Sequence, residues 1–70
     1  MEMQPVESSN VAEIGHDPET QKLHIRFKDG SLHEYSDVPA ETHEELMMAD
    51  SKGRYVHENL KDRFDHARIE

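Results

Sequence analysis

Six histidines among 70 residues are the side chains best suited to chemistry, because imidazole acts both as a metal ligand and as an acid–base group. Two stretches approach the His-Glu-x-x-His spacing that places two zinc ligands on one face of a helix. In the stretch that begins at His43, Met47 occupies the position of the second ligand, and in the stretch that begins at His57, Lys61 occupies it. A protonated lysine does not ligate a metal, so the sequence predicts no metal site.

Catalytic chemistry has equally weak support in the sequence. Ser8 and Ser9 lack the strand-to-helix turn that would activate a serine, and the neighbouring Glu44 and Glu45 diverge by about 100° on a helix. A chain of this length also leaves little room for a pocket of about 300 Å³ or more. We therefore expect no enzyme activity, no catalytic residue and no cofactor.

The candidate binding residues lie near the C-terminus. Residues 51–70 carry five basic and four acidic side chains, whereas residues 1–50 carry three basic and twelve acidic ones. The basic segment combines its cations with an aromatic ring, and it contains Lys52, Arg54, Tyr55, His57, Lys61 and Arg63. Two interpretations stay open. Either Lys52 and Arg54 contact phosphates, with Arg63 extending the track, or these cations neutralise nearby carboxylates.

The composition limits the class of protein. A formal net charge of −8 opposes long-range attraction to nucleic acid, so any such contact must be local and salt-sensitive. The chain has no cysteine, and no apolar run approaches the 18 residues of a membrane-spanning helix. We expect a cytoplasmic protein without membrane contact.

A hairpin of alternating polarity is the first element that could position these side chains. Lys22–Phe27 alternates polar and apolar residues, which is the clearest strand signal in the chain, and Val11–His16 precedes it as a shorter strand. Lys28-Asp29-Gly30 suits a three-residue turn with glycine in the left-handed region, and this turn pairs Phe27 with Ser31.

The register of this hairpin decides which side chains share a face. The three-residue turn places on one face Leu23, Ile25, Phe27, His33 and Tyr35. A rival two-residue Asp29-Gly30 turn would pair Phe27 with Leu32 and Ile25 with Glu34. We prefer the first because it keeps Glu34 out of the core, although it exposes Leu32. An exposed Leu32 and a free sheet edge would favour a homodimer.

The period lengthens after Pro39 and predicts two helices. Ala40–Ala49 is rich in helix formers, and its expected buried stripe consists of His43, Leu46, Met47 and Ala49. Asp50-Ser51 can cap a second helix from Lys52 to about Asp62, in which Val56, Leu60 and Phe64 recur every four residues.

These elements predict an α+β fold: a three-stranded antiparallel β-meander followed by two helices packed on one face, in the order β-β-β-α-α. We expect residues 1–7 to form a flexible N-terminal arm, residues 8–64 a single domain and residues 65–70 a C-terminal tail.

Several short motifs follow one another in a set order: Ser8-Ser9-Asn10, Gly15-His16-Asp17-Pro18, Phe27-Lys28-Asp29-Gly30-Ser31, Tyr35 with Val38-Pro39, and Ser51-Lys52-Gly53-Arg54-Tyr55 leading into Asn59-Leu60. Together, from Ser8 to Phe64, they resemble the KTSC domain. This small domain is named from the C-terminus of some lysyl-tRNA synthetases and also occurs as stand-alone bacterial and phage proteins.

The central Tyr-x-Tyr of that family would fall on positions 33 and 35, which here read His33-Glu34-Tyr35. The resemblance implies a cluster of His33 and Tyr35 on the sheet face, with His16 and His33 as packed, hydrogen-bonded rings in place of aromatic residues. If the paired aromatic rings of the family stack on nucleic-acid bases, this chain retains one ring of the pair, that of Tyr35.

The resemblance implies a small non-catalytic binding module that associates with RNA, tRNA-like or single-stranded, through the local basic patch, whose contacts would be Lys52, Arg54, Tyr55, Lys61 and Arg63. The alternative is an acidic protein–protein interaction module, a stand-alone bacterial or phage accessory protein that engages a basic partner with its strands and first helix. The salt dependence of RNA affinity distinguishes the two.

Overall fold

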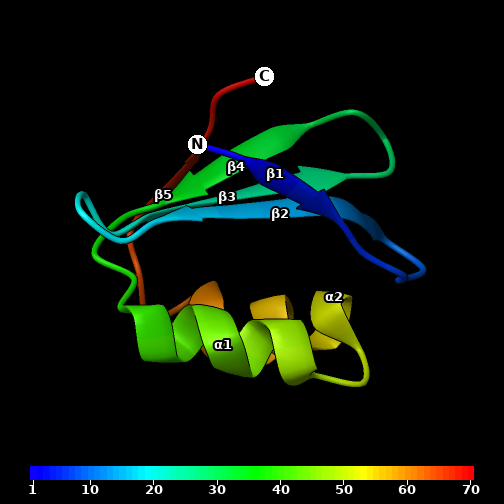
Figure 1. Cartoon of the computed structure of the whole chain (residues 1–70). Coiled ribbons are helices and arrows are strands. Elements are labelled where there is room, and N and C mark those ends of the chain that lie inside the picture. The colour runs from blue at the N-terminus through cyan, green and yellow to red at the C-terminus, as the bar shows by residue number, and fades with distance from the viewer.

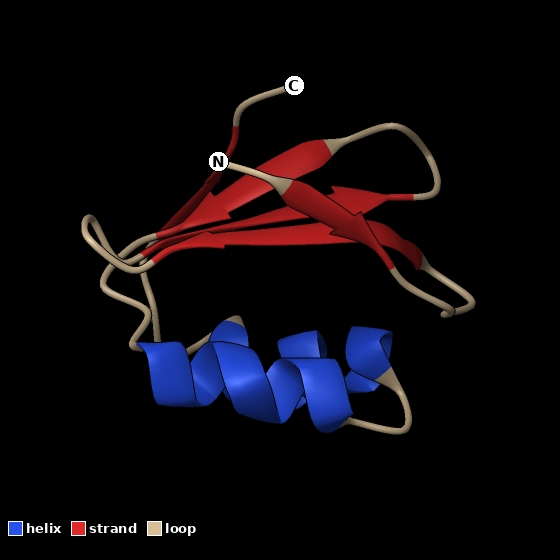
Figure 2. Ribbon diagram, in the orientation of Figure 1, coloured by secondary structure: helices blue, strands red, loops and turns tan.

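The alternating segment Lys22–Phe27 forms β3, the central strand of a five-stranded antiparallel sheet. The structure, a computed structural model, describes all residues from 1 to 70. The strands are β1 (Met3–Pro5), β2 (Val11–Asp17), β3 (Lys22–Phe27), β4 (Leu32–Tyr35) and β5 (His66–Arg68), and they lie side by side in that order. The helices all lie below one face of the sheet and leave the other face uncovered (Figures 1 and 2).

The predicted register of the β3–β4 hairpin is confirmed. Leu23 pairs with Tyr35 and Ile25 with His33, as the three-residue turn requires. The Phe27 amide donates a hydrogen bond of 2.9 Å to the Ser31 carbonyl, and Gly30 adopts a φ of 95°. Glycine fits this turn because the left-handed region carries no steric cost for a residue without Cβ.

The prediction of three strands is wrong, because both chain ends add an edge strand. Met3–Pro5, predicted as part of a flexible arm, forms β1 against β2, with Met3 opposite Gly15. A Cβ at Gly15 would lie 2.5 Å from the Met3 Sδ, so glycine makes the room that the methionine side chain needs. His66–Arg68, predicted as part of a tail, forms β5 against β4. Strands of three residues are too short to show an alternating pattern, which is why the sequence did not reveal them.

The predicted exposure of Leu32 is also wrong, since only 7% of this residue is exposed. The chain beyond β5 runs beside it: the Ile69 amide donates to the Leu32 carbonyl at 2.8 Å, and the Leu32 amide donates to the Glu70 carbonyl at 3.2 Å. The edge of β4 is therefore occupied within the same chain. This removes one of the two features that favoured a homodimer, the exposed Leu32, while the edges of the sheet are now β1 and β5.

The core lies between the inner face of the sheet and the helices. Its buried members are Val11, Ile14, Leu23, Ile25, Tyr35, Val38, Leu46, Val56 and Leu60. Of the stripe predicted for α1 (Ala40–Met48), Leu46 is buried and joined by Thr42, whereas the other three residues are only half-buried. The second predicted helix consists of α2 (Lys52–Tyr55) and a π-helical turn, η1 (Val56–Leu60). The Lys61 amide closes that turn on the Val56 carbonyl at 3.0 Å.

Two stacked histidines join α1 to the sheet. The rings of His16 on β2 and His43 on α1 lie 4.8 Å apart between centroids, with 11° between their planes. The His16 Nε2 donates to the Val38 carbonyl at 2.8 Å. His16 is therefore a packed, hydrogen-bonded ring, as predicted, but it pairs with His43 and not with the cluster of His33 and Tyr35.

This stack predicts that the stability of the domain falls at acid pH. Burial lowers the pKa of His43, and charge on His16 lowers it further. The unfolded chain then binds this proton more readily than the folded chain. The contribution of His43 to the free energy of unfolding is fully present above the ordinary histidine pKa of about 6.5 and is lost as the pH falls below that value.

We expect the melting temperature, measured by circular dichroism, to drop between pH 7.5 and 5, and to drop less in His43→Gln. An equal drop in the variant would contradict this assignment, and His57→Gln, which alters an exposed ring, is the control.

Candidate functional site

A groove of about 590 Å³ lies between the inner face of the sheet and the second helical segment. The sheet side and the loop before β2 contribute Asn10, Phe27, His33, Tyr35 and His66, and the helical side contributes Ser51, Gly53, Arg54, Val56, His57 and Lys61. The expectation that so small a chain leaves little room for a pocket of about 300 Å³ or more is therefore wrong. The sheet wall of the groove comes from three adjacent strands, since Phe27 ends β3, His33 and Tyr35 lie on β4, and His66 lies on β5.

The sheet side of the groove is a group of stacked rings. Tyr35 and His66 lie opposite each other on β4 and β5, with 5.0 Å between ring centroids and 25° between planes. His33 lies 6.4 Å from His66, and the Phe27 ring meets His33 edge-on at 5.1 Å. Burial raises the pKa of Tyr35, so its phenol stays neutral at physiological pH. The predicted cluster of His33 and Tyr35 exists, and it includes His66 from the predicted tail.

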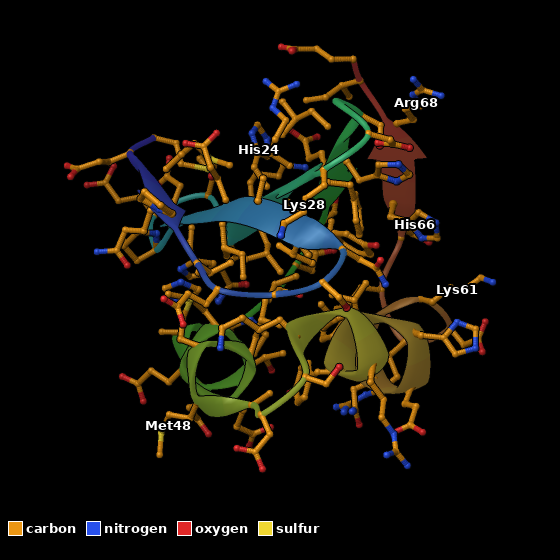
Figure 3. The ribbon with its side chains drawn as sticks, turned by 90° about the vertical axis from the view of Figure 1, so that its right-hand side faces the viewer. His24, Lys28, Met48, Lys61, His66 and Arg68 are labelled. Carbon is orange, nitrogen blue, oxygen red and sulfur yellow. The ribbon has the colours of Figure 1, made fainter.

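The helical side of the groove presents cations. Arg54 and Lys61 line it together with His57, and all three residues are exposed. The Arg54 Nε donates to Glu58 Oε2 at 3.1 Å, but both side chains are largely exposed, so this pair adds little stability and can open to a ligand. In Figure 3, Lys61 and His66 lie on the same side of the molecule, below and on β5 respectively, and Arg68 lies farther along β5.

Three residues of the predicted basic patch lie outside the groove. The Lys52 Nζ donates to the Ala49 carbonyl at 3.0 Å and so holds the end of α1. The Tyr55 hydroxyl donates to Glu45 Oε1 at 2.8 Å, and burial together with this bond raises the Tyr55 pKa. The Arg63 guanidinium lies 5.6 Å from the centre of the Phe64 ring. Lys52 and Arg63 therefore make local contacts without an ion pair, and Arg54 is the one cation of the predicted patch that pairs with a carboxylate, that of Glu58.

The charge within the groove is opposite in sign to that of the whole chain. No aspartate or glutamate is among the residues that line it, although the chain carries a net charge of −8. A second hollow of about 390 Å³ shares Asn10, Phe27 and His33 with the groove and adds Lys28, Asp29 and Ser31. Hydrogen bonds from the Ser31 hydroxyl and amide, at 2.6 and 2.9 Å, lower the pKa of Asp29 and occupy one of its oxygens. The two neighbouring hollows thus present rings and cations together with one carboxylate, that of Asp29.

The uncovered face of the sheet has a different character, because its basic groups are paired with carboxylates. His24 Nε2 lies 2.8 Å from Glu34 Oε2, and the Arg26 Nη2 lies 2.8 Å from Glu70 Oε1. In Figure 3 the His24 side chain points away from the helices. No group of three histidines, aspartates or glutamates anywhere in the chain is arranged to hold a metal ion. The cationic character therefore belongs to the groove and not to the sheet as a whole.

A five-stranded antiparallel sheet with helices on one face defines a small α+β domain, as the sequence predicted in outline. More particularly, the chain belongs to the KTSC domain family, since the family profile described as "KTSC domain" matches residues 7–64. The crystal structure of a KTSC domain protein from Yersinia pestis superposes with a TM-score of 0.93 and 36% sequence identity, covering 99% of this chain and 97% of that one. The resemblance inferred from the motifs is confirmed.

Relatives occur both as small proteins and as parts of larger ones. A protein of Tsukamurella paurometabola is 45% identical over 62 residues, which are 89% of this chain and 92% of that protein. A lysine–tRNA ligase of Nostoc sp. is 38% identical over 63 residues, which are 90% of this chain and 11% of the ligase. The chain thus corresponds to a small part of that enzyme. No helix in the structure has the length and apolar character needed to cross a membrane.

Proposed function

We propose that this protein is a small, non-catalytic, cytoplasmic binding module whose groove holds an unpaired segment of RNA. The observation that carries the proposal is the composition of the groove: two permanent cations and a group of stacked rings, without a carboxylate, in a chain that is otherwise strongly acidic. Proteins that bind single-stranded nucleic acid combine a cationic path for the backbone with rings on which bases stack.

The two sides of the groove divide the recognition between them. Arg54 and Lys61 on the helical side contact phosphates, and on the sheet side the exposed ring of His66, which stacks on the buried Tyr35, accepts a base. The rings lie between a sheet and a helix, so a paired base within a duplex would not reach them. This geometry favours single-stranded RNA, or an unpaired loop or end of a tRNA, over a regular duplex.

The relation to lysine–tRNA ligases supports an RNA partner. Those proteins are named for a reaction on tRNA, and this chain resembles about a tenth of the length of one of them. The resemblance does not extend to the remainder of the enzyme, so we transfer the association with RNA and not the ligase activity.

Binding should depend strongly on salt and on the two cations in the groove. We expect the affinity for a ten-nucleotide single-stranded RNA to fall with a log–log salt slope of about 2 to 3, and Arg54→Ala with Lys61→Ala to reduce that slope by about 1.4, since each phosphate contact to a single strand contributes about 0.7. Isothermal titration calorimetry from 20 to 200 mM salt measures both values.

The matched control is Lys52→Ala with Arg63→Ala, which removes the same charge from the same segment but outside the groove. We expect it to leave the affinity within about threefold of the parent protein. Equal losses in the two double variants would refute the placement of the site in the groove. Absence of binding even at 20 mM salt would refute RNA binding altogether and leave the interaction with a basic protein as the remaining hypothesis.

A further inference from the structure

Three of the six histidines line the groove, and their ring nitrogens are available to a ligand. Two other histidine rings form hydrogen bonds within the chain: His16 with the Val38 carbonyl and His24 with the Glu34 carboxylate. His33, His57 and His66 all line the groove, and none of them shares in these bonds. These imidazoles add rings and polar atoms to the site, and imidazole is the side chain that can also gain a positive charge within the physiological pH range.

The groups that face these rings provide almost no negative charge. On the sheet side they are the neutral Tyr35 and Arg68, which lies opposite His33 on β5. On the helical side they are Arg54, Lys61 and Glu58, the last of which is paired with Arg54. In the adjoining hollow are Lys28 and Asp29, whose carboxylate already accepts two hydrogen bonds from Ser31.

A bound phosphate would supply the negative charge that this environment lacks. A phosphodiester bound in the groove would favour the protonated form of an imidazole beside it, because an opposite charge nearby stabilises the charged form. By linkage, a ligand that favours the protonated form is itself bound more tightly when protons are available.

From this arrangement we infer that binding in the groove is proton-linked: RNA is bound with uptake of protons by His33, His57 and His66, so that acidification strengthens binding. The inference rests on the proposed function and names the regulation of the same site. It assigns to His33, which stands where the family pattern has a tyrosine, the role of a titratable contact.

The experiment measures binding of a ten-nucleotide oligouridylate, whose bases do not take up protons near pH 5, by isothermal titration calorimetry at constant salt. We expect the affinity to rise about tenfold or more from pH 7.5 to 5.5, which is the change expected from one or more added charge-assisted contacts. The log–log salt slope should increase by about 0.7 for each histidine that becomes a phosphate contact. Titrations at pH 6.5 in two buffers of different ionisation enthalpy should show a net uptake of protons on binding.

The variant pair His33→Gln and His66→Gln, combined in one protein, removes two of the three rings from the groove. We expect this protein to bind more weakly than the parent at pH 7.5, because the His66 ring is lost as a base contact, and to gain little affinity on acidification, whereas the parent gains about tenfold. The control is His24→Gln, which removes a histidine from the uncovered face, where Glu34 pairs with it. It should keep the full gain. Circular dichroism at each pH confirms that the proteins remain folded, which the acid-sensitive His43 makes necessary.

The outcomes separate the two proposals. Binding that is measurable but equally strong at pH 7.5 and 5.5 would overturn the proton linkage and leave RNA binding intact. A pH dependence that persists unchanged in the variant with both substitutions would also overturn it, because the protons would then bind elsewhere. No binding at either pH would overturn the proposed function itself.

Discussion

Replacement of Leu60 by alanine is expected to lower the free energy of unfolding by about 2–5 kcal/mol. Leu60 is fully buried, and it lies in η1, the turn that carries the helical wall of the groove onto the core. Removing its side chain loses the transfer free energy of the buried atoms and leaves a cavity. Small domains have only about 5–15 kcal/mol of total stability, so this loss brings the variant close to unfolding. Urea unfolding followed by circular dichroism measures the effect.

Met48→Ala is the control for this substitution, because Met48 is 84% exposed on α1. Surface changes of this kind alter stability by about 0.5 kcal/mol or less. If Leu60→Ala also changed stability by less than about 1 kcal/mol, η1 would not be packed as described, and the helical wall of the groove would lose its support. At a urea concentration where the parent protein is folded and Leu60→Ala is unfolded, we expect the parent protein to bind RNA and the variant not to bind it.

The residues of the site that could be predicted are those whose positions follow from strand alternation and turn geometry. Alternation over Lys22–Phe27 and the glycine turn determine a single register, so His33 and Tyr35 were correctly placed on the inner face of the sheet. The turn decides this because a shift by one residue would move every side chain of β4 to the other face. The role of Leu32 could not be read in the same way, because its cover comes from residues 69–70, beyond a short strand without periodicity.

The basic patch shows a different limit. The predicted patch consists of cations that are close together in the sequence. The cations that line the groove are those spaced three or four residues apart on one helical segment. Arg54, His57 and Lys61 follow one another at intervals of three and four residues and therefore share a helix face. Lys52 and Arg63 fall on other faces and make local contacts. That spacing was present in the sequence, but it identifies a site only when the sheet provides the opposite wall of the groove.

Truncation of the chain after Phe64 tests whether the last six residues are a strand or a tail. A free tail would be lost without effect, whereas removal of β5 should lower the free energy of unfolding by about 2–4 kcal/mol. This range combines the exposure of Leu32, worth up to about 1.5–3 kcal/mol for a large apolar side chain, with the loss of the Tyr35–His66 stack, worth about 0.5–1.5 kcal/mol. The Ser36 amide also loses its bond to the Asp65 carbonyl. Urea unfolding of the full and truncated chains measures the difference.

The companion variant is His66→Ala, which keeps the strand and removes only the ring. We expect His66→Ala to lower the free energy of unfolding less than the truncation does, because Leu32 keeps its bonds to Ile69 and Glu70. We expect it to weaken RNA binding about as much as the truncation does. A truncated chain that unfolds at the same urea concentration as the full chain would show that β5 contributes nothing to the fold. If the truncated chain also bound RNA with unchanged affinity, the sheet wall of the groove would not be a contact surface. Because the C-terminal segment both bonds to Leu32, through Ile69 and Glu70, and carries His66, stability and binding should fall together in the truncation and separate in the point variant.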